Sequence, residues 1–213
     1  MYLWCQQNNI QKTMLDTNLS EKTVIDVYSF FREICAQYLV REPIRLGGHG
    51  IVVQIDESCF SHKVKHHRGR GPQETVWVFG LVDLSNKPAR GYMEVVENRA
   101  AATLLPIIQR VCRPGTIINS DEWPAYRRIQ QTTGFAHNTV NHSVHFVDPV
   151  TGIHTQNIES YWAKHKLVLK KMKGCRREFL TEYLQEFMWR DKFEAGQSTF
   201  EALCGHIALI HRV

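Results

Sequence analysis

Two short apolar runs in the sequence, rich in β-branched residues, each lead into a pair of acids. The first run ends in Asp56 and Glu57, and the second ends in Asp121 and Glu122. Such runs are typical of buried strands, where a carboxylate is costly unless it is paired or binds a metal ion. Because side chains alternate along a strand, only one acid of each pair faces a given side. Asp56 and Asp121 directly follow the apolar runs and are the better candidates, with Glu57 and Glu122 as alternatives.

The order of elements between residues 51 and 173 predicts the fold class. In chain order, we expect strands near 51–60, 75–84 and 90–97, a helix near 99–112, a strand at 116–121, a short helix near 124–133, a weak strand near 137–142 and a long helix near 155–173. Three antiparallel strands followed by helix, strand, helix, strand and helix predict an α/β protein with a mixed five-stranded sheet flanked by helices. This order coincides with the ribonuclease H-like plan.

The segments on either side of this region read as helical. Apolar positions recur at steps of three and four before residue 42, and Ser20 is a suitable N-cap. Residues 1–45 therefore form an N-terminal helical segment, either a helix-turn-helix or an α-hairpin packed on the main domain. Pro and Gly residues at 41–50 mark the boundary. We expect a catalytic domain at 50–195, closing with an amphipathic helix at 178–193, and a C-terminal tail at 196–213.

The composition is that of a globular chain with one sizeable core. The 213 residues are 43% hydrophobic and carry a formal net charge of +5, which is compatible with nucleic-acid binding without requiring it. Much of the positive charge gathers at 62–70 and 164–177. The six cysteines include no Cys-x-x-Cys pair, and no apolar run approaches the roughly 18 residues of a membrane span. We expect an intracellular protein.

A third acid, Glu159, opens the long basic helix. In a helix that begins near Thr155, Glu159 shares one face with Trp162, Lys166 and Lys170. An acid followed by cations on one face suits metal binding at the helix start and phosphate binding along its length. The alternative is a solvated basic face with Trp162 in the core. We favour the core for Trp162 and DNA binding for Lys166.

Each acid also has a plain structural interpretation when it is taken alone. Asp56 is then an edge residue of a strand, Asp121 caps the following helix, and Glu159 is a first-turn glutamate favoured by the helix dipole. Three carboxylates that converge from separate elements are instead what a pair of Mg²⁺ ions needs against a phosphodiester. The combination therefore points to phosphoryl transfer on nucleic acid.

Two loops add candidate DNA contacts. The loop at 62–71 contains glycines, which permit close backbone approach to phosphate, and it carries several cations. Its candidate DNA-binding residues are Lys63, Lys65, Arg68 and Arg70, and the alternative is a solvated loop. His154 precedes the long helix without the His-x-x-x-His spacing of a helical zinc site. We expect it to orient the helix start or to contact the leaving DNA strand.

Several motifs together resemble a known family. They are Ile55-Asp-Glu-Ser58, Arg68-Gly-Arg70, Trp77-Val-Phe-Gly80, Ser120-Asp-Glu-Trp123 followed by Tyr126, and His154-Thr-Gln-Asn-Ile-Glu-Ser-Tyr-Trp162. From Gln54 to about Phe193, the chain resembles the catalytic domain of Merlin-type DNA transposases and their bacterial insertion-sequence relatives, which belong to the DDE group. The last motif is closer to the eukaryotic Merlin form than to the bacterial one.

The resemblance implies a mechanism and a set of roles. Asp56, Asp121 and Glu159 would hold two Mg²⁺ or Mn²⁺ ions about 4 Å apart, one to activate water and then a 3′-hydroxyl, the other to stabilise the leaving oxygen. Lys166 would be the downstream basic partner, and Asn157 is an alternative ligand because some relatives have asparagine in third position. The implied partners are DNA, as transposon ends and target, and a second copy of the chain in a homodimer or higher oligomer.

One departure from the family pattern keeps other interpretations open. Such transposases often carry a cysteine-rich zinc module near the N-terminus, which this sequence lacks. The chain is therefore also compatible with a fragment, a shortened relative or a domesticated copy. The rival functions are a DNA-binding protein without catalysis and a structure-specific nuclease of the same fold. The expected location is the nucleus of a eukaryotic host, or the nucleoid and cytoplasm of a bacterial one.

Overall fold

The computed structural model describes residues 1–60, 75–87, 89–141, 147, 149, 152–193 and 198–211. The chain forms two compact units, one of residues 44–178 and one that combines residues 1–43 with 179–213. Each unit has its own core of buried apolar side chains. Within the described residues, no helix has both the length and the apolar character needed to cross a bilayer.

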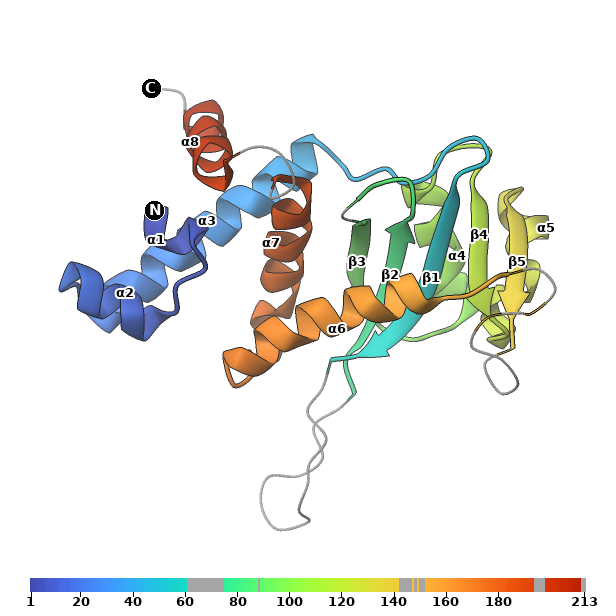
Figure 1. Cartoon of the computed structure of the whole chain (residues 1–213), viewed down its shortest axis with the longest axis horizontal. Coiled ribbons are helices and arrows are strands. Elements are labelled where there is room, and N and C mark those ends of the chain that lie inside the picture. Colours follow the sequence, from blue (N-terminus) through green and yellow to red (C-terminus); the bar gives the residue numbers. More distant parts are fainter. Residues whose placement is uncertain are drawn as a thin grey trace, which may run out of the picture. The chain divides into compact units, whose positions relative to one another are not determined.

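A mixed five-stranded sheet lies at the centre of the unit of residues 44–178 (Figure 1). Its strands are β1 Val52–Cys59, β2 Trp77–Asp83, β3 Arg90–Val96, β4 Ile117–Asp121 and β5 Ala136–Val140, in the spatial order β3-β2-β1-β4-β5. β1, β2 and β3 pair antiparallel, while β4 pairs parallel with both β1 and β5. This is the predicted ribonuclease H-like plan, and the fold class is confirmed.

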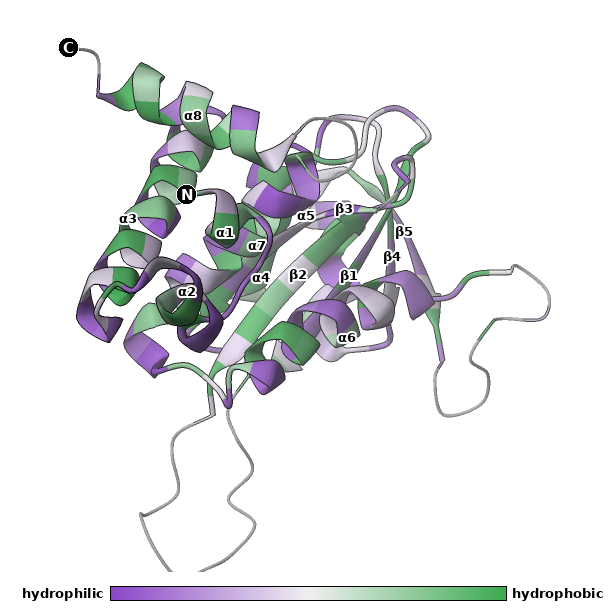
Figure 2. Ribbon diagram, turned by 60° about the vertical axis from the view of Figure 1, so that its left-hand side comes forward, coloured by the Kyte–Doolittle hydropathy of each residue, from purple (hydrophilic) through white to green (hydrophobic). Residues whose placement is uncertain are grey.

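Helices cover both faces of this sheet. α4 Ala101–Val111, the 3₁₀ turn η1 Pro124–Arg128 and α5 Ile129–Thr133 pack on one face, where apolar side chains of β1 and β2 enter the core. α6 Gln156–Lys171 lies on the other face against β1 and β2 (Figure 2). Because both faces are covered, β2 is buried along nearly its whole length and its sequence is a continuous apolar run.

Two glycines allow α6 to approach the sheet closely. A Cβ added at Gly80 of β2 would lie 2.3 Å from the Trp162 ring, and one added at Gly91 of β3 would lie 2.5 Å from the Tyr161 ring. Both aromatic rings are buried and occupy the space that these glycines leave. The Trp162 and Tyr161 rings, which pack over these two glycines, therefore set the distance between α6 and the sheet.

The other unit consists of helices. These are α1 Tyr2–Cys5, α2 Ile10–Thr17, α3 Glu21–Arg41, α7 Leu180–Phe193 and α8 Thr199–Ile210. Ser20 caps α3 as predicted, because its side chain accepts a hydrogen bond from the Thr23 N–H. α3 packs against α2, α7 and α8, and its buried Phe31 shares a core with Trp189 and Leu203.

This helical unit differs from the division expected from the sequence. Residues 179–193, expected in the catalytic domain, pack with the N-terminal helices, and residues 199–210 form a helix within the expected tail. The physical reason is burial, because Trp189 of α7 and Leu203 of α8 are fully buried in the core formed with α3. Apolar periodicity predicted a helix at 178–193 but carried no information on its packing partner.

Candidate active site with three carboxylates

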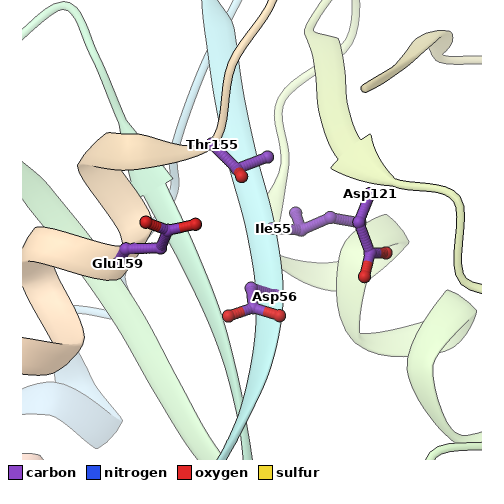
Figure 3. A pocket seen from close by; sticks show the side chains of 5 residues that line it. All are labelled: Ile55, Asp56, Asp121, Thr155 and Glu159. Carbon is purple, nitrogen blue, oxygen red and sulfur yellow. The ribbon is translucent and has the colours of Figure 1, made fainter. Parts of the chain in front are cut away.

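Three acids from separate elements line one pocket (Figure 3). Asp56 lies in β1, Asp121 ends β4, and Glu159 lies in the first turn of α6. Ile55 and Thr155 complete the lining, and Figure 3 shows the three carboxylate groups around a common space. These are the acids that the sequence pattern selected, and the fold brings all three together.

The sheet register explains why Asp56 and Asp121 meet. β1 and β4 are parallel, with Gln54 opposite Asn119, so the residues two positions later are neighbours on the same face. α6 packs on that face and contributes Glu159. Alternation turns Glu57 to the opposite face, where its carboxylate accepts a hydrogen bond of 2.7 Å from the Tyr126 hydroxyl.

Asp56 is partly buried, whereas Glu159 is exposed. Burial raises the pKa of Asp56 to about 6, and the negative charges of Asp121 and Glu159 act in the same direction. A hydrogen bond of 3.0 Å from the Trp162 indole Nε1–H to Oδ2 opposes this rise. Trp162 itself is 4% exposed, so its predicted core position is confirmed.

The pocket has the donor chemistry that a hard divalent cation requires. Asp56, Asp121 and Glu159 offer carboxylate oxygens, which Mg²⁺ and Mn²⁺ prefer. A cation among them would relieve the mutual repulsion that raises the pKa of Asp56. Within the described residues, no three His, Cys, Asp or Glu side chains are gathered closely enough to hold one ion together.

Asn157, the alternative ligand, is not among the residues that line the pocket. A step of two residues turns a helix by about 200°, so Asn157 and Glu159 point in nearly opposite directions from α6. The Asn157 backbone N–H donates a hydrogen bond of 3.0 Å to Gln54 Oε1. The pocket lining therefore favours Glu159 over Asn157 as the third ligand of the prediction.

His154 lies at the start of α6. Its Nδ1 accepts a hydrogen bond of 3.3 Å from the Gln156 N–H, and its carbonyl accepts one of 2.7 Å from the Gln54 amide. These contacts fit the expectation that His154 orients the helix start. Its contact with a leaving DNA strand stays a prediction.

The predicted DNA-binding cations have different surroundings. Lys166 is half-buried and donates a hydrogen bond of 2.7 Å to the Ser58 hydroxyl, and burial lowers its pKa. Lys170, one helical turn later, is exposed. Both lie on α6 beyond Glu159, as the helical spacing predicted. The residues predicted in the basic loop, Lys63, Lys65, Arg68 and Arg70, lie outside the described residues.

Sequence reasoning missed the side chains that support the acids. Gln54 holds the start of α6, and Ser58 holds Lys166. The only sequence signal for both was alternation, since Gln54 and Ser58 lie on the same side of β1 as Asp56. The Tyr126 hydroxyl contact with Glu57 joins residues 69 positions apart, and no local pattern indicates it.

Comparisons with known proteins relate the chain to transposases. The model of the ISXO2-like transposase domain matches residues 46–192. An uncharacterized transposase-like protein of Haemophilus influenzae is 35% identical over 99 residues, which cover 46% of this chain and 78% of that protein.

Two solved structures of low sequence identity are also similar to this chain. One is a chain of the simian T-cell lymphotropic virus intasome in complex with PP2A regulatory subunit B56 gamma, with 18% identity and a TM-score of 0.46. That match covers 69% of this chain and 50% of the intasome chain, so this chain spans half of its length. The other is the catalytic core domain of BIV integrase, with 15% identity and a TM-score of 0.44, covering 72% of this chain and 93% of that one.

Proposed function

The chain belongs to the ISXO2-like transposase family, and on this premise we propose that it is a DNA transposase that cleaves strands at transposon ends and joins them to target DNA. The observation that carries the proposal is the pocket lined by Asp56, Asp121 and Glu159 within the matched residues. The catalytic chemistry would be that of the DDE group.

Asp56, Asp121 and Glu159 would hold two Mg²⁺ or Mn²⁺ ions. The negative charges of Asp121 and Glu159 act on Asp56, and bound cations would offset them. When bound, such ions lower the pKa of an attacking water or hydroxyl and stabilise negative charge on the leaving oxygen.

The neighbouring side chains would orient the acids and the DNA. The Trp162 indole fixes one oxygen of Asp56, and the Trp123 N–H, 3.0 Å from Asp121 Oδ1, fixes one oxygen of Asp121. Both carboxylate groups line the pocket. Lys166 and Lys170 follow Glu159 along α6 and would bind the phosphates that flank the scissile bond.

The finer assignments belong to the same proposal. The motif His154–Trp162 favours a Merlin-type enzyme over a bacterial insertion-sequence enzyme. Two transposon ends have to be brought together, so we expect a homodimer or higher oligomer. The enzyme would act where its DNA is, which is the nucleus of a eukaryotic host or the nucleoid of a bacterial one.

A strand-transfer assay tests the proposal against both rivals. The substrate is DNA with pre-cleaved terminal 3′-hydroxyl ends, and the product is target DNA joined to those ends in the presence of Mg²⁺. A transposase joins them, a nuclease of the same fold only cuts, and a domesticated DNA-binding protein does neither. Binding or cutting without any joined product would overturn the proposal.

The Asp121→Asn variant connects this activity to the pocket. Asparagine keeps the oxygen that accepts the Trp123 N–H but removes the charge. We expect normal binding to DNA ends and loss of Mg²⁺-dependent nicking and joining by about 1,000-fold or more. The matched control is Glu122→Gln, at the exposed neighbouring carboxylate, which should act as the wild type does. Nicking by Asp121→Asn at the wild-type rate would exclude Asp121 from the site.

A further inference from the structure

The N-terminus of α6 needs a hydrogen-bond partner from another element. Thr155 occupies the N-cap position, but its side chain forms no capping hydrogen bond. The N–H groups in the first turn of a helix have no partner within the helix. Thr155 and Ile158 are both buried, so water is a poor substitute there. An acceptor from outside α6 is therefore required.

Gln54 of β1 supplies this acceptor. Its Oε1 accepts hydrogen bonds from the Asn157 N–H at 3.0 Å and the Ile158 N–H at 3.1 Å. Its Nε2 donates a hydrogen bond of 2.7 Å to the His154 carbonyl. The Gln54 side chain is only 1% exposed, so these bonds form out of contact with water. One amide thus bonds the backbone on both sides of Thr155, about 100 residues further along the chain.

The position of Gln54 links two of the three acids. Gln54 precedes Asp56 by two residues and therefore faces the same side of β1. Its two N–H partners, in Asn157 and Ile158, immediately precede Glu159. A shift of α6 by one residue along β1 would break both bonds. The Gln54 amide therefore fixes where Glu159 lies relative to Asp56.

Trp162 provides a second point of attachment on the same helix. Its indole donates to Asp56 Oδ2, and its ring fills the space over Gly80. Glu159 lies between this contact and the Gln54 contact along α6. The segment that carries Glu159 is thus held at both ends by β1, once through Gln54 and once through Asp56 itself.

We infer that Gln54 is a positioning residue of the carboxylate site, which sets the separation of Asp56 and Glu159 and thereby the affinity of the site for divalent ions. This inference rests on the proposed function. A cap needed only for folding would change stability and leave the ion affinity of the folded protein unaltered. A positioning residue changes the ion affinity of the folded protein.

The test is a Mn²⁺ titration of the folded protein followed by electron paramagnetic resonance of the free ion. Gln54→Met has a side chain of similar length with neither the acceptor nor the donor. We expect it to bind Mn²⁺ about 10-fold more weakly than the wild type, which is typical for loss of a group that orients a metal ligand. Hydrogen exchange of the Asn157 and Ile158 amides, measured in the same samples, should become faster.

Three further variants separate positioning from general damage. Gln54→Glu keeps the acceptor for both N–H groups but loses the donor to the His154 carbonyl, so it should restore part of the amide protection. Gln54→Asn is one methylene shorter, repeats the test with a milder change and should weaken binding. Asn119→Leu is the matched control, because Asn119 precedes Asp121 by two residues but its amide accepts from Asn138 of β5. It should bind Mn²⁺ as the wild type does.

The outcomes distinguish this inference from the proposed function. Faster amide exchange with unchanged Mn²⁺ affinity in Gln54→Met and Gln54→Asn would show a cap for folding only and overturn the inference. Equal weakening by Asn119→Leu would overturn it too, and so would a wild-type protein whose Mn²⁺ binding is unaffected by Asp56→Asn. If Gln54→Met weakens Mn²⁺ binding as expected while the wild type joins no DNA ends, the inference stands and the proposed function fails.

Discussion

Asp56 and Glu57 are adjacent in β1 but belong to opposite faces of the sheet. Burial is the largest cause of a raised pKa in both, to about 6 for Asp56 and about 7 for Glu57. Asp56 shares a pocket with two further acids. Glu57 lies on the face that carries the apolar core and accepts a hydrogen bond from the buried Tyr126 hydroxyl.

The difference shows that a raised pKa does not by itself identify a functional acid. Glu57 has a neutral donor within the fold, and this hydrogen bond opposes the rise in its pKa without cancelling it. Asp56 has the Trp162 donor, and each acid has its pKa raised by two neighbouring carboxylates, Asp56 by Asp121 and Glu159, and Glu57 by Asp56 and Asp121. What distinguishes the candidate site is therefore that Asp56 lines one pocket together with Asp121 and Glu159.

The largest effect on stability is expected from closing the space over Gly80. A Cβ in Gly80→Ala would lie 2.3 Å from the Trp162 ring, so the ring has to move away from Asp56. We expect a loss of about 3 kcal/mol in the free energy of unfolding, measured by urea denaturation. The control is Gly205→Ala in α8, where no atom lies within 4 Å and alanine favours the helix. Equal stability of both variants would mean that Trp162 is not held against β2.

The two acids also predict how stability depends on pH in the absence of metal ions. Both have a pKa in the folded protein above the value near 4 that is usual for acids. Between about pH 4 and pH 7 the unfolded chain loses these protons while the folded protein retains them, so stability falls as pH rises. Neutralising either acid, as in Asp56→Asn or Glu57→Gln, should add about 2 kcal/mol at pH 8 and little at pH 4.

Adding Mg²⁺ to the same unfolding experiment should distinguish the acid on the α6 face of the sheet from the acid on the core face. At pH 8 it is expected to raise the unfolding midpoint of the wild type and of Glu57→Gln, because both retain the three acids of the pocket. It should have little effect on Asp56→Asn. A response of Asp56→Asn equal to that of Glu57→Gln would place the ion elsewhere.

A smaller effect is expected from Tyr126→Phe on the core face. The change removes the donor to Glu57 without altering the ring that packs in the core. The hydrogen bond lowers the pKa of Glu57, so its loss should raise that pKa further and cost about 1–2 kcal/mol at pH 8. Near pH 5, where Glu57 is protonated, the cost should shrink. A weaker response to Mg²⁺ in this variant would contradict the separation of the two faces.

The sequence was sufficient to predict the sheet and its three acids. β-branched runs located β1 and β4, and alternation selected Asp56 over Glu57. Helical spacing placed Glu159 and Lys166 on one helix. These features were predictable because each depends on periodicity within a short segment.

Contacts between distant segments were not predictable in this way. Gln54 in an apolar run gives no sign that it caps a helix 103 residues later, and Gly80 gives no sign that Trp162 occupies the space above it. The packing of Trp189 with the N-terminal helices was missed for the same reason. Each depends on tertiary packing, for which one sequence provides no local pattern.

The most direct measurement compares Mg²⁺-dependent nicking of end-containing DNA by Asp56→Asn and Glu57→Gln. The two variants remove one negative charge from adjacent residues of the same strand. We expect Asp56→Asn to lose nicking by about 1,000-fold or more and Glu57→Gln to nick at about the wild-type rate. Wild-type nicking by Asp56→Asn, or an equal loss in both variants, would contradict a catalytic site confined to the α6 face of the sheet.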